Sequence, residues 1–146
     1  MAVVPLRLGE SAPDQVRGGI IAVGNFDGVH LGHAALIAAA RTEAGSKSVV
    51  AVTFDPHPLV LLAPERYQPP LTTVTDRARH LGEIGADHVV VLQTTRELLA
   101  QLADAGLVDV AFHVDLTQER KGYASERELN AIRREYIERA RALMLP

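Results

Sequence analysis

The 146-residue chain contains no cysteine and no tryptophan, and aromatic residues make up only 4% of it. Without cysteine, disulfides and thiolate metal sites are excluded. No apolar run reaches the roughly 18 residues that a membrane-spanning helix needs, and the first residues lack the basic flank and apolar core of a signal peptide. A basic stripe that would bind nucleic acid is also missing, and the net charge is −3. We therefore expect a cytoplasmic protein that binds neither membranes nor nucleic acid; its oligomeric state is not indicated.

Hydrophobic residues make up 47% of the chain and charged residues 23%, which is typical of one globular domain. Apolar, β-branched segments alternate with helical patterns, and this predicts βαβ units with a parallel sheet. The expected strands are 18–24, 48–54, 87–92 and 108–115, and the expected helices are 31–43, 75–84, 95–105 and a last amphipathic one that begins near Ser125. Gly45 is expected to end the helix 31–43, and Thr95 is the expected N-cap of the helix 95–105. The sequence thus predicts an α/β fold, a Rossmann-like open parallel sheet of four to five strands flanked by helices, in a single domain over residues 1–146.

A proline-rich segment interrupts this alternation between Asp55 and Pro70. It holds most of the chain's eight prolines, so it is expected to form neither a regular helix nor a central strand. Connections of about 16 residues in a compact domain are usually functional or disordered.

The most informative segment is the junction between the strand expected at 18–24 and the helix expected at 31–43. Its two histidines, His30 and His33, lie three residues apart with Gly32 between them. A helix N-terminus carries unpaired N–H groups and the positive end of the helix dipole, so it favours anions. Imidazoles at that place can also donate to phosphate oxygens. The junction therefore predicts a site for the phosphates of a nucleotide.

Four segments together carry a family resemblance. They are GNFDGVHLGH at 24–33, VTFDPHP at 52–58, PLTT at 70–73 and GADHVVVL at 85–92. In this order they closely resemble the N-terminal FMN adenylyltransferase module of bacterial bifunctional riboflavin kinase/FAD synthetase, which belongs to the HxGH nucleotidylyltransferase superfamily. The resemblance covers about residues 18–97, and the C-terminal third of the chain diverges.

The resemblance implies a nucleotidyltransferase that joins ATP and FMN into FAD and releases pyrophosphate, with Mg²⁺ bridging phosphate oxygens and with no metal site built from side chains. The expected partners are therefore small molecules, nucleotides and flavin. The resemblance also implies that His30 and His33 are catalytic. The expected nucleotide-binding residues are Gly24, Asn25, Phe26, Asp27, Gly28 and Gly32. The expected flavin-binding residues are Asp55, Pro56, His57, Pro58, Leu71, Thr72 and Thr73.

The residues themselves leave several of these roles open. Asp27 is equally consistent with a place near a metal and with ordering of the turn. The segment 55–58 would also serve as a rigid turn without substrate contact. The hydroxyls and N–H groups of the segment 71–73 fit a helix N-cap as well as an anion site.

Part of the family pattern is missing from these 146 residues. The Gly-Glu-Asp-Phe-Arg-Phe-Gly-like stretch has no counterpart, nor does the Ile-Ser-Ser-Thr-x-Ile-Arg motif that holds the ATP phosphates from the opposite side, nor a riboflavin kinase domain. Arg120 and Lys121 are the only basic pair near the expected site. We therefore expect nucleotide binding with impaired turnover. The alternatives are an inactive nucleotide-binding module and a nucleotidylyltransferase with another acceptor.

Overall fold

The computed structural model of the chain describes residues 1–105 together with 131, 134–135, 138–139 and 142. The chain divides into two compact units. The first unit consists of residues 1–55 and 69–93, and the second consists of residues 56–68 and the residues from 94 onward.

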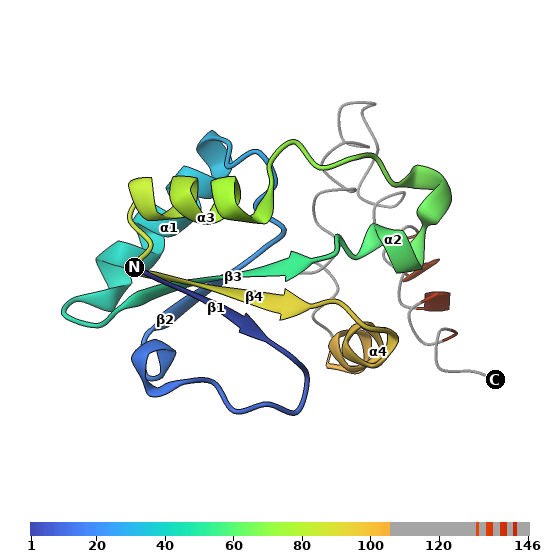
Figure 1. Cartoon of the computed structure of the whole chain (residues 1–146), viewed down its shortest axis with the longest axis horizontal. Coiled ribbons are helices and arrows are strands. Elements are labelled where there is room, and N and C mark those ends of the chain that lie inside the picture. The colour runs from blue at the N-terminus through green and yellow to red at the C-terminus, as the bar shows by residue number, and fades with distance from the viewer. Residues whose placement is uncertain (106–130, 132–133, 136–137, 140–141, 143–146) are drawn as a thin grey trace. The chain divides into compact units, whose positions relative to one another are not determined.

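The first unit is built on a sheet of four parallel strands, β1 (Ala2–Leu6), β2 (Ile20–Val23), β3 (Val49–Asp55) and β4 (His88–Gln93). Their order across the sheet is β1-β4-β3-β2 (Figure 1). Because all strands run the same way, the carboxyl ends of β2, β3 and β4 lie at the same end of the sheet. In open α/β sheets, ligands bind at this end. The predicted α/β class and parallel sheet are confirmed.

Two helices of the first unit, α1 (Leu31–Ala44) and α3 (Val74–Glu83), cover one face of this sheet (Figure 1). The inner face of α1 presents Ile37, Ala40 and Ala44, which recur at helical spacing and are buried against the strands. The helix ends at Gly45, whose φ of +56° is easy for glycine. Gly45 was predicted to end this helix, and it does.

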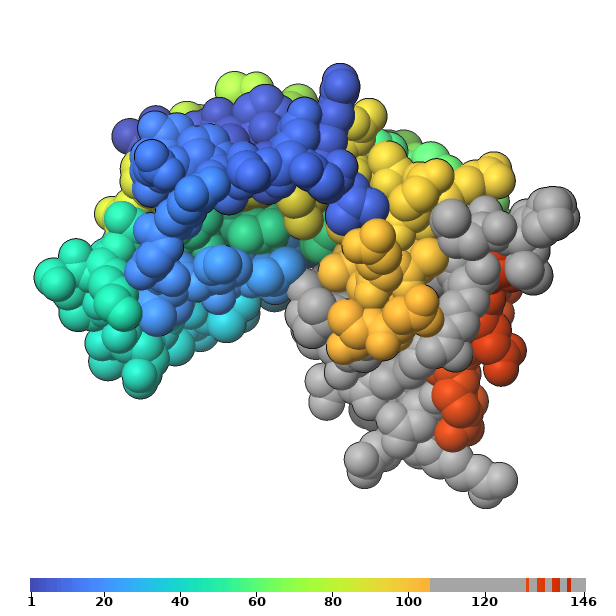
Figure 2. Space-filling view, turned by 90° about the horizontal axis from the view of Figure 1, so that it is seen from below, coloured from blue at the N-terminus to red at the C-terminus, as the bar shows by residue number. Residues whose placement is uncertain are grey.

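The opposite face of the sheet carries a smaller apolar cluster. Val4, Val50 and Val90 of three neighbouring strands pack with Val16 of the short 3₁₀ helix η1 (Asp14–Val16). Seen from this side, the N-terminal residues, in blue, lie on the surface of the molecule (Figure 2).

The second unit contains α2 (Leu59–Leu62), the 3₁₀ helix η2 (Pro64–Arg66) and α4 (Arg96–Asp104). The expectation that the proline-rich segment forms no helix is wrong for α2, a single turn. Pro58 lies at its N-cap, where a missing N–H costs no hydrogen bond, so proline does not prevent this turn. The predicted N-cap of α4 is confirmed, since the Thr95 hydroxyl accepts from the Leu98 N–H at 3.2 Å.

The six predicted elements that fall within residues 1–105 are present, each with bounds within two residues of the expected ones. Strand β1 was not predicted. The expected strand 108–115 lies outside the described residues. The described residues of the expected C-terminal helix, 131 and five later ones, are helical. None of the helices described is long and apolar enough to cross a membrane.

Candidate active site

The expected nucleotide site is a turn that follows β2 and leads directly into α1; we call residues 24–33 the histidine turn. The Gly24 N–H donates to the Val52 carbonyl at 3.0 Å, which fixes the start of the turn to β3. His30 is the N-cap residue of α1 and His33 lies in its first turn. The predicted strand–turn–helix placement of both histidines is therefore confirmed.

The two histidines cap the helix reciprocally. Nδ1 of His30 accepts from the Gly32 N–H at 3.1 Å, and Nδ1 of His33 accepts from the His30 N–H at 3.2 Å. Their rings are stacked, with centroids 3.7 Å apart and planes 20° apart. An Nδ1 that accepts a hydrogen bond carries no proton, so the ring proton is on Nε2 in both imidazoles. Each ring therefore has its N–H donor at Nε2, and the two rings stack at the N-terminus of α1.

Gly32 makes this arrangement sterically feasible. A Cβ at this position would lie 3.0 Å from Cε1 and 3.1 Å from Nδ1 of His30, closer than nearly all real contacts of that kind. The glycine therefore leaves room for the His30 ring to fold back over the first turn of the helix. This role is internal to the protein, whereas Gly32 was expected to bind nucleotide.

Phe26 supports the pair from inside the protein. Its side chain is completely buried, and its ring meets the His33 ring edge-on with centroids 5.1 Å apart. Phe26 was expected to bind nucleotide; in the structure its side chain packs under a histidine. Asn25 is buried as well.

Asp27 fastens the histidine turn to the segment before α3. Its carboxylate accepts from the Leu71 N–H at 2.9 Å and from both the N–H and the hydroxyl of Thr72 at 3.0 Å. The Gly28 N–H donates to the same Thr72 hydroxyl at 3.2 Å. Partial burial by itself raises the pKa of Asp27, but these hydrogen bonds, together with the charge of Arg77, outweigh burial and lower the pKa below its usual value.

Of the two roles left open for Asp27, the structure shows the ordering one. Both carboxylate oxygens accept hydrogen bonds from residues 44 or 45 positions later in the chain. Among the residues described, no group of three or more His, Asp or Glu side chains could hold a metal ion.

The expected flavin residues fall into both units. In the first unit, Leu71 is 81% exposed, whereas the Thr73 hydroxyl caps α3 by accepting from the Asp76 N–H at 3.1 Å. Asp55 ends β3. The N-cap role considered for the segment 71–73 is therefore confirmed for Thr73.

In the second unit, Pro56 and His57 are held by neighbouring residues. The Thr94 hydroxyl donates to the Pro56 carbonyl. Nδ1 of His57 accepts from the Leu59 N–H at 3.1 Å, so this ring too carries its proton on Nε2, and the ring centroid lies 6.2 Å from that of Tyr67. Pro58 is fully buried.

Sequence reasoning missed Arg77. This residue of α3 is only 5% exposed, and its Nη1 donates to the Thr53 hydroxyl at 3.0 Å and to the Phe54 carbonyl at 3.1 Å. A signal was available, because Arg77 lies four residues before the buried Leu81 and so occupies the inner face of the helix. A buried arginine needs specific acceptors, which makes such a position worth examining.

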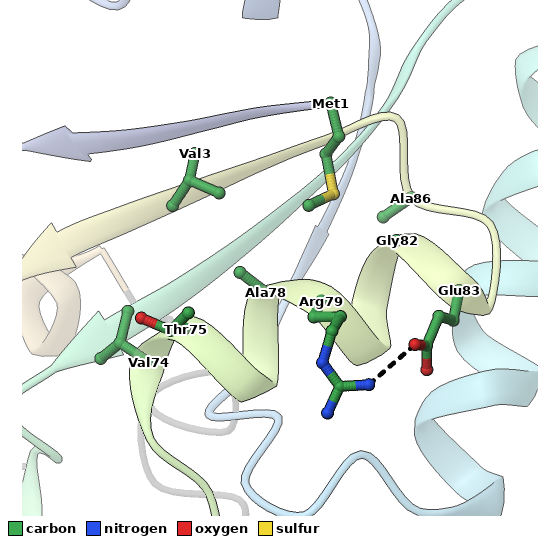
Figure 3. Close-up of a pocket in the computed structure, with 9 residues that line it drawn as sticks. All are labelled: Met1, Val3, Val74, Thr75, Ala78, Arg79, Gly82, Glu83 and Ala86. Atoms are coloured by element: carbon green, nitrogen blue, oxygen red, sulfur yellow. Dashed lines mark hydrogen bonds and ion pairs between the residues drawn. The ribbon is translucent and has the colours of Figure 1, made fainter.

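An apolar hollow of about 770 Å³ lies elsewhere in the first unit, between β1 and α3 (Figure 3). It is lined by residues such as Val3 and Ala78 and by Arg79 and Glu83, which form an ion pair of 2.8 Å. None of the predicted site residues lines it.

The comparisons with known proteins agree on one family. The family model described as FAD synthetase matches residues 12–118. A bifunctional riboflavin kinase/FMN adenylyltransferase of Listeria monocytogenes is 40% identical over 102 residues, which cover 66% of this chain and 32% of that protein. The protein of the same description from Escherichia coli K12 is 34% identical over 95 residues, which cover 64% of this chain and 30% of that protein.

A solved structure supports the fold alone. The chain described as a macrolide-efflux protein from Streptococcus pneumoniae superposes with a TM-score of 0.54 at 23% identity, over 68% of this chain and 35% of that one. This chain spans about a third of the length of the curated relatives it matches. With the family model matching well over half of its residues, the chain belongs to the FAD synthetase family.

Proposed function

We propose that this chain transfers the adenylyl group of ATP to FMN, forming FAD and pyrophosphate. The observation that carries the proposal is the reciprocally capped pair of His30 and His33, which presents two Nε2–H donors at a helix N-terminus in a member of the FAD synthetase family. The relatives' printed descriptions name FMN adenylyltransferase activity. The family match favours this function over an inactive module and over a different acceptor.

The proposed reaction is an in-line displacement at the α-phosphorus of ATP. A phosphate oxygen of FMN forms the new P–O bond, and the bond from the α-phosphorus to the oxygen that bridges to the β-phosphorus breaks. The electron pair leaves with pyrophosphate. Negative charge grows on the departing phosphates, so donors placed there in advance lower the barrier.

The two imidazoles and α1 supply those donors. Each neutral ring donates one Nε2–H hydrogen bond to the triphosphate, and the dipole of α1 adds a favourable potential. Because backbone N–H groups hold both Nδ1 atoms, the rings do not reorient when charge develops. This preorganisation is the protein's contribution to the step.

Magnesium enters the proposal as part of the substrate. Mg²⁺ is usually held by substrate phosphates and water with few carboxylates. Asp27 is occupied by Leu71 and Thr72, so the proposal assigns the ion to the phosphates of ATP rather than to this side chain.

For the flavin, we propose a contact from Leu71 of the first unit, whose side chain is exposed. Flavin binding by His57 stays a separate prediction. The hydroxyls of Thr72 and Thr73 are engaged by Asp27 and Asp76, so their role toward flavin is to hold the segment in place. A cytoplasmic location also stays a prediction.

The test is a pyrophosphate-release assay with ATP, Mg²⁺ and FMN, combined with chromatographic detection of FAD. FAD formation that requires all three supports the proposal. Pyrophosphate released with another phosphorylated acceptor but not with FMN would indicate a different substrate. ATP binding without any product in either assay would favour the inactive module.

A further inference from the structure

Arg77 is a buried cation at a helix position that an apolar residue would fill at lower cost. It is 5% exposed, and its Nη1 makes hydrogen bonds to Thr53 and Phe54 at the end of β3. Its Nε is buried and has no hydrogen-bond partner among the residues that the structure describes. Burial lowers the pKa of the guanidinium, whereas the charges of Asp27 and Asp55 raise it. A group with such a desolvation cost is expected to have a specific task.

Thr53 connects this arginine to the histidine turn. Its side chain is 1% exposed, and its hydroxyl accepts from Arg77 at 3.0 Å while donating to the Asn25 carbonyl at 2.8 Å. A hydroxyl has one donor and two acceptor positions, so accepting from Arg77 directs the single proton toward Asn25. The hydrogen-bonded series therefore runs from α3 through β3 into the turn.

The turn needs such support because its backbone is strained. Phe26 has a φ of +52°, and Val29, which is β-branched, has a φ of +40°. Left-handed backbone is unfavourable for such residues and persists only where the surroundings fix it. Phe26 also packs against the ring of His33. A relaxed turn would therefore move Phe26 and, with it, the histidine pair.

We propose that Thr53 and Arg77 are positioning residues, which hold the strained turn and thereby keep the stacked imidazoles of His30 and His33 ready to bind triphosphate. The nucleotide part of this inference rests on the proposed function. The geometric part concerns the free protein and is tested without nucleotide.

The experiment compares Thr53→Val, which keeps the shape but removes the hydroxyl, with Thr53→Ser, which keeps the hydroxyl. Thr42→Val is the matched control, because the Thr42 hydroxyl donates to the Ala38 carbonyl at 3.1 Å on the exposed side of α1. The first measurement is the NMR shift of the Cε1–H protons of His30 and His33 in the free protein, which reports ring stacking. The second is the affinity for Mg–ATP, measured by calorimetry well below the melting temperature.

We expect Thr53→Val to move both histidine signals and to weaken Mg–ATP about tenfold or more, while Thr53→Ser and Thr42→Val behave like the unmodified chain. A folded Thr53→Val variant with unchanged histidine signals would overturn the proposal, and so would an equal loss in Thr53→Ser. If Thr53→Val does not fold, Arg77→Lys decides by the same signals, and unchanged shifts in it overturn the proposal. If the unmodified chain does not bind Mg–ATP, the proposed function fails while the histidine signals still test the positioning role.

Discussion

At the scale of single residues, the chemistry of the site comes from how the protein uses the inner nitrogen of each histidine. The backbone N–H groups of His30 and Gly32 occupy the two Nδ1 atoms. A lysine at either place would carry more charge, but it would neither cap the helix nor stack on its neighbour. The pair therefore combines a structural role with the donation of hydrogen bonds to an anion.

His33→Ala removes one of these donors and is expected to weaken Mg–ATP at least about tenfold. Charge-assisted hydrogen bonds contribute about 1.5–3 kcal/mol each, which supports this size of effect. Isothermal titration measures the affinity. His80→Ala is the control, since His80 pairs with Glu83 on α3 and takes no part in the turn. Equal affinity of the unmodified chain and of a variant that lacks both His30 and His33 would rule the site out.

Asp27→Asn is expected to lower the melting temperature at neutral pH by roughly 4 °C. This corresponds to about 1 kcal/mol for a chain of this size, after a discount for the partial exposure of the carboxylate. The pKa of Asp27 is lowered from its usual 3.8. The stabilisation by the ionised form is therefore fully present above pH 3.8 and is lost as the pH falls through the lower, folded value.

Melting curves of the unmodified chain and Asp27→Asn across the acid range check this sign. The difference in melting temperature should be constant near neutral pH and shrink in acid. Asp14→Asn serves as the control, because Asp14 is almost fully exposed and its ion pair among the described residues is with its near neighbour Arg17. A difference that grows as the pH falls would contradict the assignment.

At the scale of elements, the histidine turn and the start of α3 behave as one piece. Asp27 and Gly28 on one side and Leu71 and Thr72 on the other are joined by four hydrogen bonds. The expected nucleotide residues and the expected flavin residues of the first unit are therefore mechanically connected. A substitution in one of the two segments is therefore expected to change ligand binding by the other.

Thr72→Val tests this connection, because it removes the hydroxyl that bonds Gly28 and Asp27. We expect it to weaken Mg–ATP and FMN together, whereas His57→Ala weakens FMN alone. Quenching of flavin fluorescence measures the FMN affinity and calorimetry measures the ATP affinity. Thr72→Ser, which keeps the hydroxyl, should retain both affinities. A loss of FMN affinity alone in Thr72→Val would mean that the hydroxyl contacts flavin rather than holding the turn.

Local signals in the sequence predicted local structure well. The alternation of strand and helix patterns predicted the parallel sheet. As expected, α1 ends at Gly45 and α4 begins after the N-cap Thr95. Strand β1 was missed because Pro5 interrupts its short pattern; proline is tolerated there because β1 is an edge strand. The bond from Arg77 to Thr53 and the bonds of Asp27 to Thr72 join residues 24 to 45 positions apart, and a single sequence contains no periodic signal for such pairs.

At the scale of the whole molecule, the 146 residues contain the histidine turn but not every motif of the expected phosphate site. The histidine turn and the segment 69–73 belong to the first unit. The family model matches up to residue 118, and the Ile-Ser-Ser-Thr-x-Ile-Arg motif of the family is missing from the 146 residues. The expected substitutes, Arg120 and Lys121, lie outside the described residues. The organisation of the whole chain as a single domain stays a prediction.

We therefore predict that this chain binds Mg–ATP but forms FAD slowly. Transfer at phosphorus needs charge stabilisation on both sides of the reacting atom, and loss of one preorganised donor costs about 10²–10³ in rate. We expect the rate of FAD formation to lie at least about 10² below that of a full-length relative assayed alongside, at saturating ATP and FMN. Chromatography of FAD over time measures both rates. A rate equal to the relative's would show that another group replaces the missing donors. The variants Arg120→Ala and Lys121→Ala would then test the two expected substitutes. The exposed Lys47→Ala would serve as the control for both.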